Sequence, residues 1–188
     1  MAFDADRSLR RLKPAKRTAP LNSRPPSALP FLTAATPSAR NLLFDTTVYI
    51  HAGQGRLGPD AQAFVAASQA HHCSVCLGEL ALSLGYLDPR HSGTPAAASF
   101  LAGVLRHVPT HRIVEPDDTV FIEANIATGI LARTQGLAPS DRRRLLNDAL
   151  TLATAGKKGL VVLTANIADF DLLSQLQPGA QVLYYTPD

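Results

Sequence analysis

The sequence predicts an α/β fold, in which a parallel sheet is covered by helices on both faces. Short apolar runs such as Leu42–Phe44 and Leu160–Leu163 have the length and composition of fully buried strands. Longer segments with helical periodicity separate these runs, and such alternation is typical of parallel sheets. The 188 residues are enough for one ordinary domain, and no internal repeat divides them.

We expect the domain to span residues 41–188. Its first part is expected to contain two short strands. The first is expected at 42–44. Residues 51–59 hold three glycines and a proline, which predicts a loop. A helix is expected at 61–70 and the second strand at 74–76.

Three further strands and a set of helices are expected in the rest of the chain. Leu77, Leu80, Ala81 and Leu84 recur at the spacing of one helical face. Further helices are expected at 95–107, 118–135 and 140–156, and further strands at 112–114, 160–164 and 182–185. Either Asp117 or Asp118 can cap the helix that runs to about Gln135.

Residues 1–40 differ in composition from the rest of the chain. They contain eight Lys or Arg against two Asp, whereas residues 41–188 contain ten Lys or Arg against thirteen Asp or Glu. The basic character therefore lies in the tail, which excludes a uniformly basic nucleic-acid-binding domain. Six prolines and few large apolar residues predict that this tail is largely disordered.

The tail has three possible roles on sequence alone. Residues 8–16 can form a short basic helix on a partner, and the whole segment can be a nucleic-acid-binding arm or a solvated extension. The sequence shows no apolar core of a signal peptide and no run long enough to cross a bilayer. We therefore expect a cytoplasmic protein with no membrane segment.

Cys73 and Cys76 are the two cysteines of the chain, and their spacing invites a zinc or a redox interpretation. A structural zinc site needs four ligands, and no second Cys or His pair has a suitable spacing. His71 and His72 adjoin Cys73, but neighbours in a strand point to opposite faces. The sequence therefore favours two small core residues in a reducing compartment.

Four acidic residues lie in or beside apolar runs, where a carboxylate is costly unless it has a function: Asp45, Glu79, Asp148 and Asp169. Asp45 and the turn before Asp169 follow expected strands, and ligands of parallel sheets collect outside the carboxyl ends of strands. Clustered carboxylates repel one another, so they must share protons or hold a cation. Mg²⁺ or Mn²⁺ suits carboxylate oxygens and supports phosphodiester hydrolysis.

Each acid also has a purely structural explanation. Asp45 can cap a strand-to-helix turn, Glu79 can begin a helix, and Asp169 can be a helix N-cap. Asp148 can be a solvent-facing helix residue. Polar side chains lie close to the acids in sequence and can orient them: Thr47, Asn147, Thr164 and Asn166.

Four segments taken in order resemble the PIN-domain nucleases, in particular the VapC-type toxins of bacterial toxin–antitoxin pairs. These segments are Leu43–Ile50, Ser74–Leu80, Asn147–Leu150 and Leu163–Phe170, and the resemblance covers residues 41 to about 185. Rival enzymes fit less well. An aspartyl-phosphate phosphatase commonly has a second Asp two residues after the first, where this chain has Thr47.

The resemblance implies a three-layer α/β/α sandwich around a four- or five-stranded parallel sheet. It implies a metal-dependent ribonuclease in which Asp45, Asp148 and Glu79 hold Mg²⁺ or Mn²⁺, with Asp169 as an outer ligand and Asn166 as its neighbour. It also implies an RNA substrate, a cognate antitoxin and a homodimer. The alternative is a PIN-like protein that binds RNA or a partner without cutting it, or a nuclease outside a toxin–antitoxin pair.

Basic residues near the acids are candidates for RNA contacts. Arg142 and Arg143, with Arg144 in the same run, precede Asp148 by about one turn, and Arg56 lies in the loop after the first strand. As a hypothesis, these side chains bind RNA phosphates or an acidic antitoxin segment. The alternative is an exposed, charged start to a helix.

Overall fold

The computed structural model describes residues 4–33, 35–36 and 40–188, and it contains a five-stranded sheet. All strand pairs are parallel, and the order in space is β3-β2-β1-β4-β5. The strands are β1 (Asn41–Phe44), β2 (Gln69–Cys73), β3 (Ile113–Val114), β4 (Val161–Thr164) and β5 (Gln181–Tyr184). The parallel sheet of the predicted sandwich is thereby confirmed.

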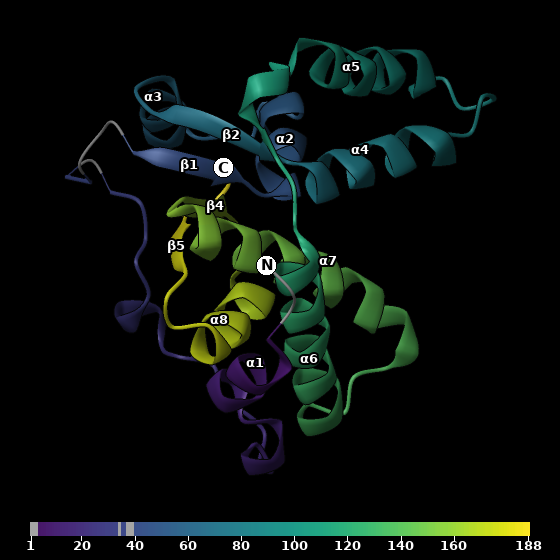
Figure 1. Cartoon of the computed structure of the whole chain (residues 1–188). Coiled ribbons are helices and arrows are strands. Elements are labelled where there is room, and N and C mark those ends of the chain that lie inside the picture. Colours follow the sequence, from purple (N-terminus) through teal and green to yellow (C-terminus); the bar gives the residue numbers. More distant parts are fainter. Residues whose placement is uncertain (1–3, 34, 37–39) are drawn as a thin grey trace.

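Helices cover both faces of this sheet (Figure 1). The connections after β1 and β2 contain α2 (Thr46–Gly53), α3 (Pro59–Ala66), α4 (Ser74–Tyr86) and α5 (Thr94–His107), followed by the short η3 (Thr110–Arg112). Those after β3 and β4 contain α6 (Asp118–Thr134), α7 (Pro139–Lys158) and α8 (Ile167–Leu176). Right-handed crossovers in opposite directions place these two sets on opposite faces. The result is the expected three-layer arrangement.

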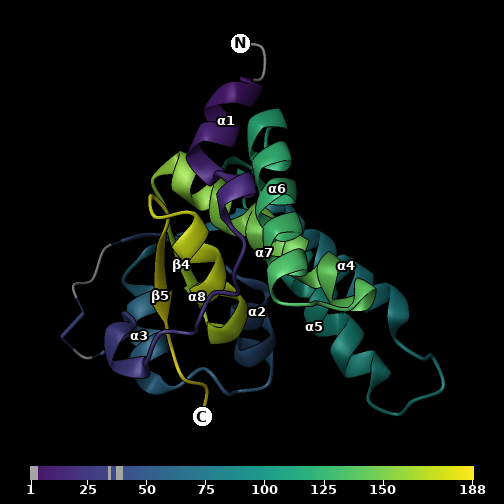
Figure 2. The same ribbon diagram turned by 90° about the horizontal axis from the view of Figure 1, so that it is seen from below.

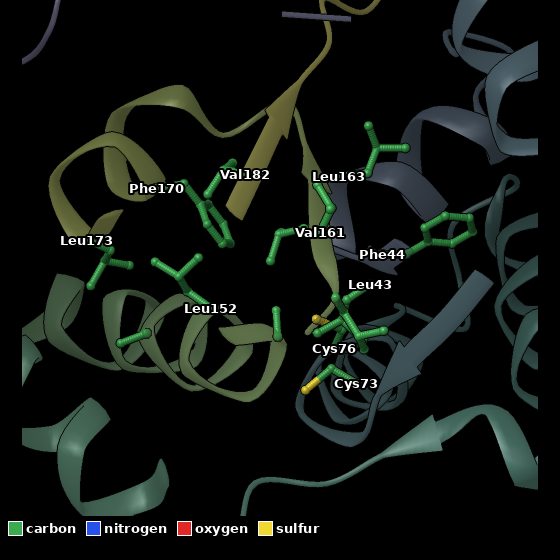
Figure 3. Packing of buried hydrophobic residues seen from close by; sticks show 14 of the residues in the cluster. Leu43, Phe44, Cys73, Cys76, Leu152, Val161, Leu163, Phe170, Leu173 and Val182 are labelled. Atoms are coloured by element: carbon green, nitrogen blue, oxygen red, sulfur yellow. The ribbon is translucent and has the colours of Figure 1, made fainter. Parts of the chain in front are cut away.

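The core lies where the central strands meet α7 and α8 (Figure 3). Leu43 of β1 pairs in register with Val162 of β4, and both side chains are fully buried. Leu152 of α7 and Phe170 of α8 are also fully buried in the same cluster. These apolar runs have no polar face because both sides of a central parallel strand are covered.

The predicted second strand is wrong in position. The structure places β2 at 69–73, and α4 begins at Ser74, so the apolar residues around Cys76 form a buried helix face. The strand contains the polar sequence Gln-Ala-His-His-Cys, which local propensity does not favour. Tertiary contacts stabilise it, because β2 pairs with β1 and β3 and because the Tyr49 hydroxyl lies 2.7 Å from His72 Nδ1. The helix expected at 61–70 consequently ends at Ala66.

The N-terminal segment also differs from the sequence-based expectation of disorder. It contains α1 (Ala5–Leu12), η1 (Pro14–Lys16) and η2 (Pro26–Ala28), while residues 1–3, 34 and 37–39 lie outside the described residues. Figures 1 and 2 show α1 beside α6, and the fully buried Leu12 belongs to the main core. The segment then crosses α8 to reach the edge strand β5, where Phe31 bridges Tyr184.

Two buried carboxylates of the body explain why the basic segment packs there. Glu123 of α6 accepts hydrogen bonds from Ser8 and Arg11. Asp171 of α8, which is 1% exposed, accepts bonds from the Arg24 backbone at 2.8 Å and from its Nε at 2.5 Å. Buried carboxylates require such partners. The charges of the tail therefore serve the fold, which composition alone does not reveal. Among the described residues, no helix has both the length and the apolar composition that a membrane crossing requires.

Candidate active site

The site lies between β1 and β4, where the strand order changes direction. From β1 the chain continues to β2 on one side, and β4 lies on the other side, so this is the topological switch point of the sheet. Asp45 follows β1 directly and is 3% exposed. Thr164 ends β4 and donates its hydroxyl to Asp45 Oδ2 at 2.7 Å. The two strand ends thus hold the first acid.

Thr47 completes the setting of Asp45. Its hydroxyl donates to Asp45 Oδ2 at 2.6 Å and accepts from the backbone N–H of Ala165 at 3.1 Å. Its own backbone N–H lies 3.3 Å from the same Oδ2, so Asp45 is also the N-cap of α2. The structural explanation for Asp45 is therefore confirmed for one oxygen. Its Oδ1 accepts no hydrogen bond from any described residue.

Asp148 lies on the buried face of α7 and is 6% exposed, which excludes the solvent-facing alternative. Burial, followed by the charges of Asp45, Asp169 and Glu79, raises the pKa of its carboxyl to about 9. A hydrogen bond with Asp169 adds to the same direction. The other three predicted acids therefore lie near Asp148, since neighbouring like charges oppose its ionisation.

Asn166 joins two of the acids. Its side-chain Nδ2 lies 3.1 Å from Asp148 Oδ2 and 3.0 Å from Asp169 Oδ2. Asn166, not Asp169, is the N-cap of α8, and its Oδ1 lies 3.4 Å from the Asp169 backbone nitrogen. Asp169 instead occupies the first turn, where the helix dipole favours a negative charge. The alternative of Asp169 as a cap is thereby excluded.

Glu79 lies six residues into α4 and does not begin that helix. Thr46 donates its hydroxyl to Oε2 at 2.5 Å, and Asn147 donates its side-chain amide to Oε1 at 2.7 Å. Asn147 precedes Asp148 on α7, so this amide ties α4 to the helix of the second acid. Thr46 was not among the residues expected at the site, because nothing in its sequence context distinguishes it from Thr47.

The side chains at this site offer the oxygen ligands that a hard divalent cation prefers. The site offers four carboxylates, and Asp45 Oδ1 receives no hydrogen bond from the described part of the chain. Its geometry is not preassembled. Across residues 4–33, 35–36 and 40–188, no group of three or more His, Cys, Asp or Glu side chains is already arranged to hold an ion.

The arginines are distributed differently from the expectation. Arg144, the third of the Arg142–Arg144 run, lies 3.5 Å from Asp169 Oδ2 through its Nε. Arg142 instead donates to the Leu137 carbonyl at 3.4 Å, and Arg143 is exposed. Arg56 donates to the backbone oxygen of the C-terminal Asp188 at 3.0 Å. Three consecutive arginines point in different directions from a helix, and the sequence does not show which of them faces the acids. In the structure it is Arg144.

His51 is a further residue near the site that the sequence did not single out. Its Nδ1 lies 2.8 Å from the Tyr185 hydroxyl at the end of β5. Burial lowers the pKa of His51, the nearby Arg56 lowers it further, and the charge of Asp45 opposes both. Burial raises the pKa of Tyr185 to about 12. Both side chains are therefore uncharged at neutral pH.

Solved structures share this arrangement of strands and helices. A chain in the structure of VapBC2 from Rickettsia felis, bound to a DNA fragment from their promoter, is 14% identical with a TM-score of 0.53. The match covers 78% of this chain and 99% of that one. A chain of the DNA-bound VapBC from Salmonella typhimurium is 18% identical, with a TM-score of 0.54 and coverage of 77% and 98%.

A third match is a chain of FitAcB from Neisseria gonorrhoeae, 19% identical, with a TM-score of 0.51 and coverage of 76% and 96%. The chain has a PIN-like fold. The fold implied by the resemblance to VapC-type toxins is thereby confirmed. No protein-family model and no curated protein matches the chain. The PIN-like fold places Asp45 and Asp148 at its switch point, as the geometry above describes.

Proposed function

We propose that the chain is a metal-dependent endoribonuclease that hydrolyses RNA phosphodiester bonds. The observation that carries this proposal is the convergence of four carboxylates at the switch point of the sheet. Asp148 is buried among like charges, and burial with those charges raises its pKa to about 9. Such an arrangement is costly for a fold and is typical of functional sites. A bound cation would let these acids ionise together.

The residues have distinct proposed roles. Asp45 and Asp148 are the principal ligands for Mg²⁺ or Mn²⁺, since both carboxylates are buried at the switch point and Asp45 keeps one oxygen that no described residue binds. Glu79 and Asp169 complete the set. The orienting residues are Thr47, Asn147, Thr164 and Asn166, each of which is bonded to one or two of the acids. When bound, the ion supplies Lewis-acid stabilisation of the charge that develops on the phosphodiester oxygens.

The chain's own residues then bind and place the substrate. Arg144 is 67% exposed at its side chain and stands beside Asp169, so it presents a cation to an RNA phosphate next to the acids. We assign a smaller part in RNA binding to Arg142, Arg143 and Arg56. Arg142 and Arg56 already donate to backbone oxygens. The buried Thr164 hydroxyl holds Asp45 in one orientation throughout.

The proposal includes a partner protein. Solved chains with this fold come from VapBC and FitAcB structures, and in two of them the VapBC is bound to DNA. By analogy, we propose that this chain is the toxin of a toxin–antitoxin pair, with a small antitoxin as its inhibitor and a homodimer as its active form. Expression with the protein encoded directly upstream, followed by copurification, tests this part separately from catalysis.

The alternative is a PIN-like protein that binds RNA or a partner without cutting it. The acids argue against RNA binding alone, because RNA phosphates are repelled by an acidic pocket that holds no cation. A protein-binding role does not require four carboxylates at one switch point. Cleavage of RNA distinguishes these possibilities directly.

The test is cleavage of single-stranded RNA by the purified chain with Mg²⁺ or Mn²⁺, with and without EDTA. Asp45→Asn and Asp148→Asn are expected to reduce the rate at least about 100-fold, the scale of losing one electrostatic group at a reacting centre. Asp141→Asn is the matched control, because Asp141 is an exposed acid on the same helix as Asp148. Cleavage that persists in EDTA, or in either site variant, would overturn the proposal.

A further inference from the structure

The two cysteines lie at the start of α4, the helix that also holds Glu79. Cys73 ends β2 and is the N-cap residue of α4, and Cys76 lies in the first turn of the same helix. Both thiols are free, and their residues are 0% and 1% exposed. Figure 3 shows both side chains in the packed interior with Leu43.

The position of the helix start decides what this pair can do. In a strand, residues three apart are separated by about 10 Å, which no disulfide can span. At a helix start the same separation is about 5 Å between Cα atoms. That distance falls inside the range of about 4.4–6.8 Å that disulfides adopt. Because α4 begins at Ser74, the two cysteines are close enough for a disulfide, which they would not be if residues 74–76 formed a strand.

The thiols already interact with one another. A hydrogen bond from Cys76 is the largest influence on Cys73 and lowers its pKa to about 7, although burial opposes this. The same interaction and burial raise the pKa of Cys76. Helix N-termini favour thiolates through their free N–H groups, and Cys73 occupies the cap of a thirteen-residue helix. This asymmetry, one activated and one protonated thiol, is suited to disulfide exchange.

We propose that Cys73 and Cys76 form a redox-active dithiol that a low-molecular-weight disulfide, such as oxidised glutathione, converts to an intramolecular disulfide. The Cys73 thiolate attacks one sulfur of the oxidant and releases one thiolate, which leaves a mixed disulfide at Cys73. Cys76 then loses its proton and attacks the Cys73 sulfur, which releases the second thiolate. Two protein thiols are oxidised, the oxidant is reduced to two thiols, and the two protons pass to the released thiolates.

A series of three contacts connects this dithiol to the acids. Cys76 Sγ lies 3.3 Å from Thr151 Oγ1, and the Thr151 hydroxyl donates to the Asn147 carbonyl at 3.0 Å. The Cys76 sulfur therefore contacts a hydroxyl whose own hydrogen is already donated to Asn147. Asn147 in turn donates its side-chain amide to Glu79 at 2.7 Å. A disulfide has no S–H and draws the two sulfurs into a bond, so oxidation changes the first contact of this series.

Burial sets the conditions of the reaction. Since neither thiol is exposed, exchange in the native protein requires the first turn of α4 to open. Exchange is therefore expected to be slow in the folded state, and equilibrium must be approached from two directions. Native protein and protein refolded from denaturant in the same redox buffer should reach the same fraction of disulfide.

The test uses the full chain in buffers of reduced and oxidised glutathione at several ratios, followed by acid quenching, alkylation and mass spectrometry. The expected result is a species that has lost two hydrogens, carries no alkyl group, and varies with the ratio as a two-electron couple. The chain has no other cysteine to confuse the result. Two alkylated cysteines at every ratio, or a glutathione adduct alone, would overturn the proposal.

Two single variants identify the attacking thiol. Cys76→Ser is expected to trap a glutathione adduct at Cys73, and Cys73→Ser is expected to remain unmodified under the same conditions. Equal trapping in both variants would overturn the assigned order of attack. The wild-type measurement remains decisive if either variant folds poorly.

A second readout rests on the proposed metal site. The affinity for Mn²⁺, measured by titration with Mn²⁺ alone, is expected to fall about 10-fold on oxidation. This is the scale of disturbing a residue that orients a metal ligand. Equal affinities in the two redox states would overturn the connection to Glu79. Absence of manganese binding in both states would instead count against the proposed nuclease and leave the disulfide measurement standing.

Discussion

The side-chain amide of Asn166 lies 3.1 Å from a carboxylate oxygen of Asp148, and through it the cap of α8 is fixed to α7. The same nitrogen reaches Asp169 at 3.0 Å. One neutral donor therefore holds two acids that repel each other. An acid at position 166 would remove this donor and add a fifth carboxylate, which makes the position a direct probe of the cluster.

Asn166→Asp is expected to destabilise the metal-free protein by about 1–3 kcal/mol, the cost of an unmet buried polar group. Capping is retained, because Asp caps helices as well as Asn does. The measurement is the thermal midpoint in EDTA and in Mn²⁺, and the ion is expected to recover most of the loss. Asn125→Asp on the exposed face of α6 is the control, with no metal-dependent change expected. Equal midpoints for Asn166→Asp in EDTA and Mn²⁺ would contradict the metal site.

Asp148 predicts how stability depends on pH in the absence of metal. Burial and the neighbouring acids raise its pKa to about 9 from an ordinary value near 3.8. The folded state then binds more protons than the unfolded state between these values, so the free energy of unfolding decreases as pH rises from about 4 to about 9. The slope from this one group is at most about 1.4 kcal/mol per pH unit.

Urea unfolding at several pH values in EDTA measures this slope. Asp148→Asn is expected to flatten it, because the amide does not titrate, and to leave the protein at least as stable at neutral pH. Asp141→Asn, which changes an exposed acid of the same helix, is expected to keep the wild-type slope. A steep slope that survives Asp148→Asn would show that another group is responsible.

The N-terminal segment gives a prediction about folding. Arg24 is the ionic partner of Asp171, whose side chain is 1% exposed. Breaking a buried pair from one side leaves an uncompensated charge and costs about 3–5 kcal/mol. Since the Arg24 side chain is 39% exposed and water reaches it, we expect Arg24→Ala to fall at the lower end, about 3 kcal/mol.

The measurement is the midpoint of urea unfolding, and Arg10→Ala is the matched control, because Arg10 is an exposed basic residue of α1. The double variant Arg24→Ala with Asp171→Asn is expected to recover part of the loss, since it removes the stranded charge. A midpoint unchanged in Arg24→Ala would indicate that the segment contributes nothing to stability, in agreement with the composition-based expectation of disorder.

The sequence predicted the acids of the site better than the segments between them. Asp45 and Asp169 follow apolar strands whose identity composition makes plain, and the switch point of a parallel sheet then brings the strand ends together. The position of β2 was missed because His71 and His72 are not typical strand residues, and pairing on both sides overrides local propensity.

Long-range partners were also beyond the sequence. The buried Glu123 and Asp171 carry no local signal that they bind Ser8 and Arg24, more than a hundred residues away. A proline-rich basic segment has the composition of a disordered tail whether or not the domain provides acids to receive it. The arginine that reaches the site could not be predicted either, because only the folded α7 shows which of three consecutive residues faces Asp169.

Arg144 gives the last prediction, on RNA binding. Its side chain is 67% exposed and its Nε lies 3.5 Å from Asp169, so Arg144→Ala should change the free energy of unfolding by less than about 1 kcal/mol. Loss of one phosphate contact should weaken RNA binding and reduce the salt slope by about one. Fluorescence anisotropy with labelled RNA in Ca²⁺ at several salt concentrations measures both. Arg142→Ala is the control, since that guanidinium binds the Leu137 carbonyl. A larger loss of affinity in Arg142→Ala than in Arg144→Ala would place the RNA on the outer side of α7, away from Asp169.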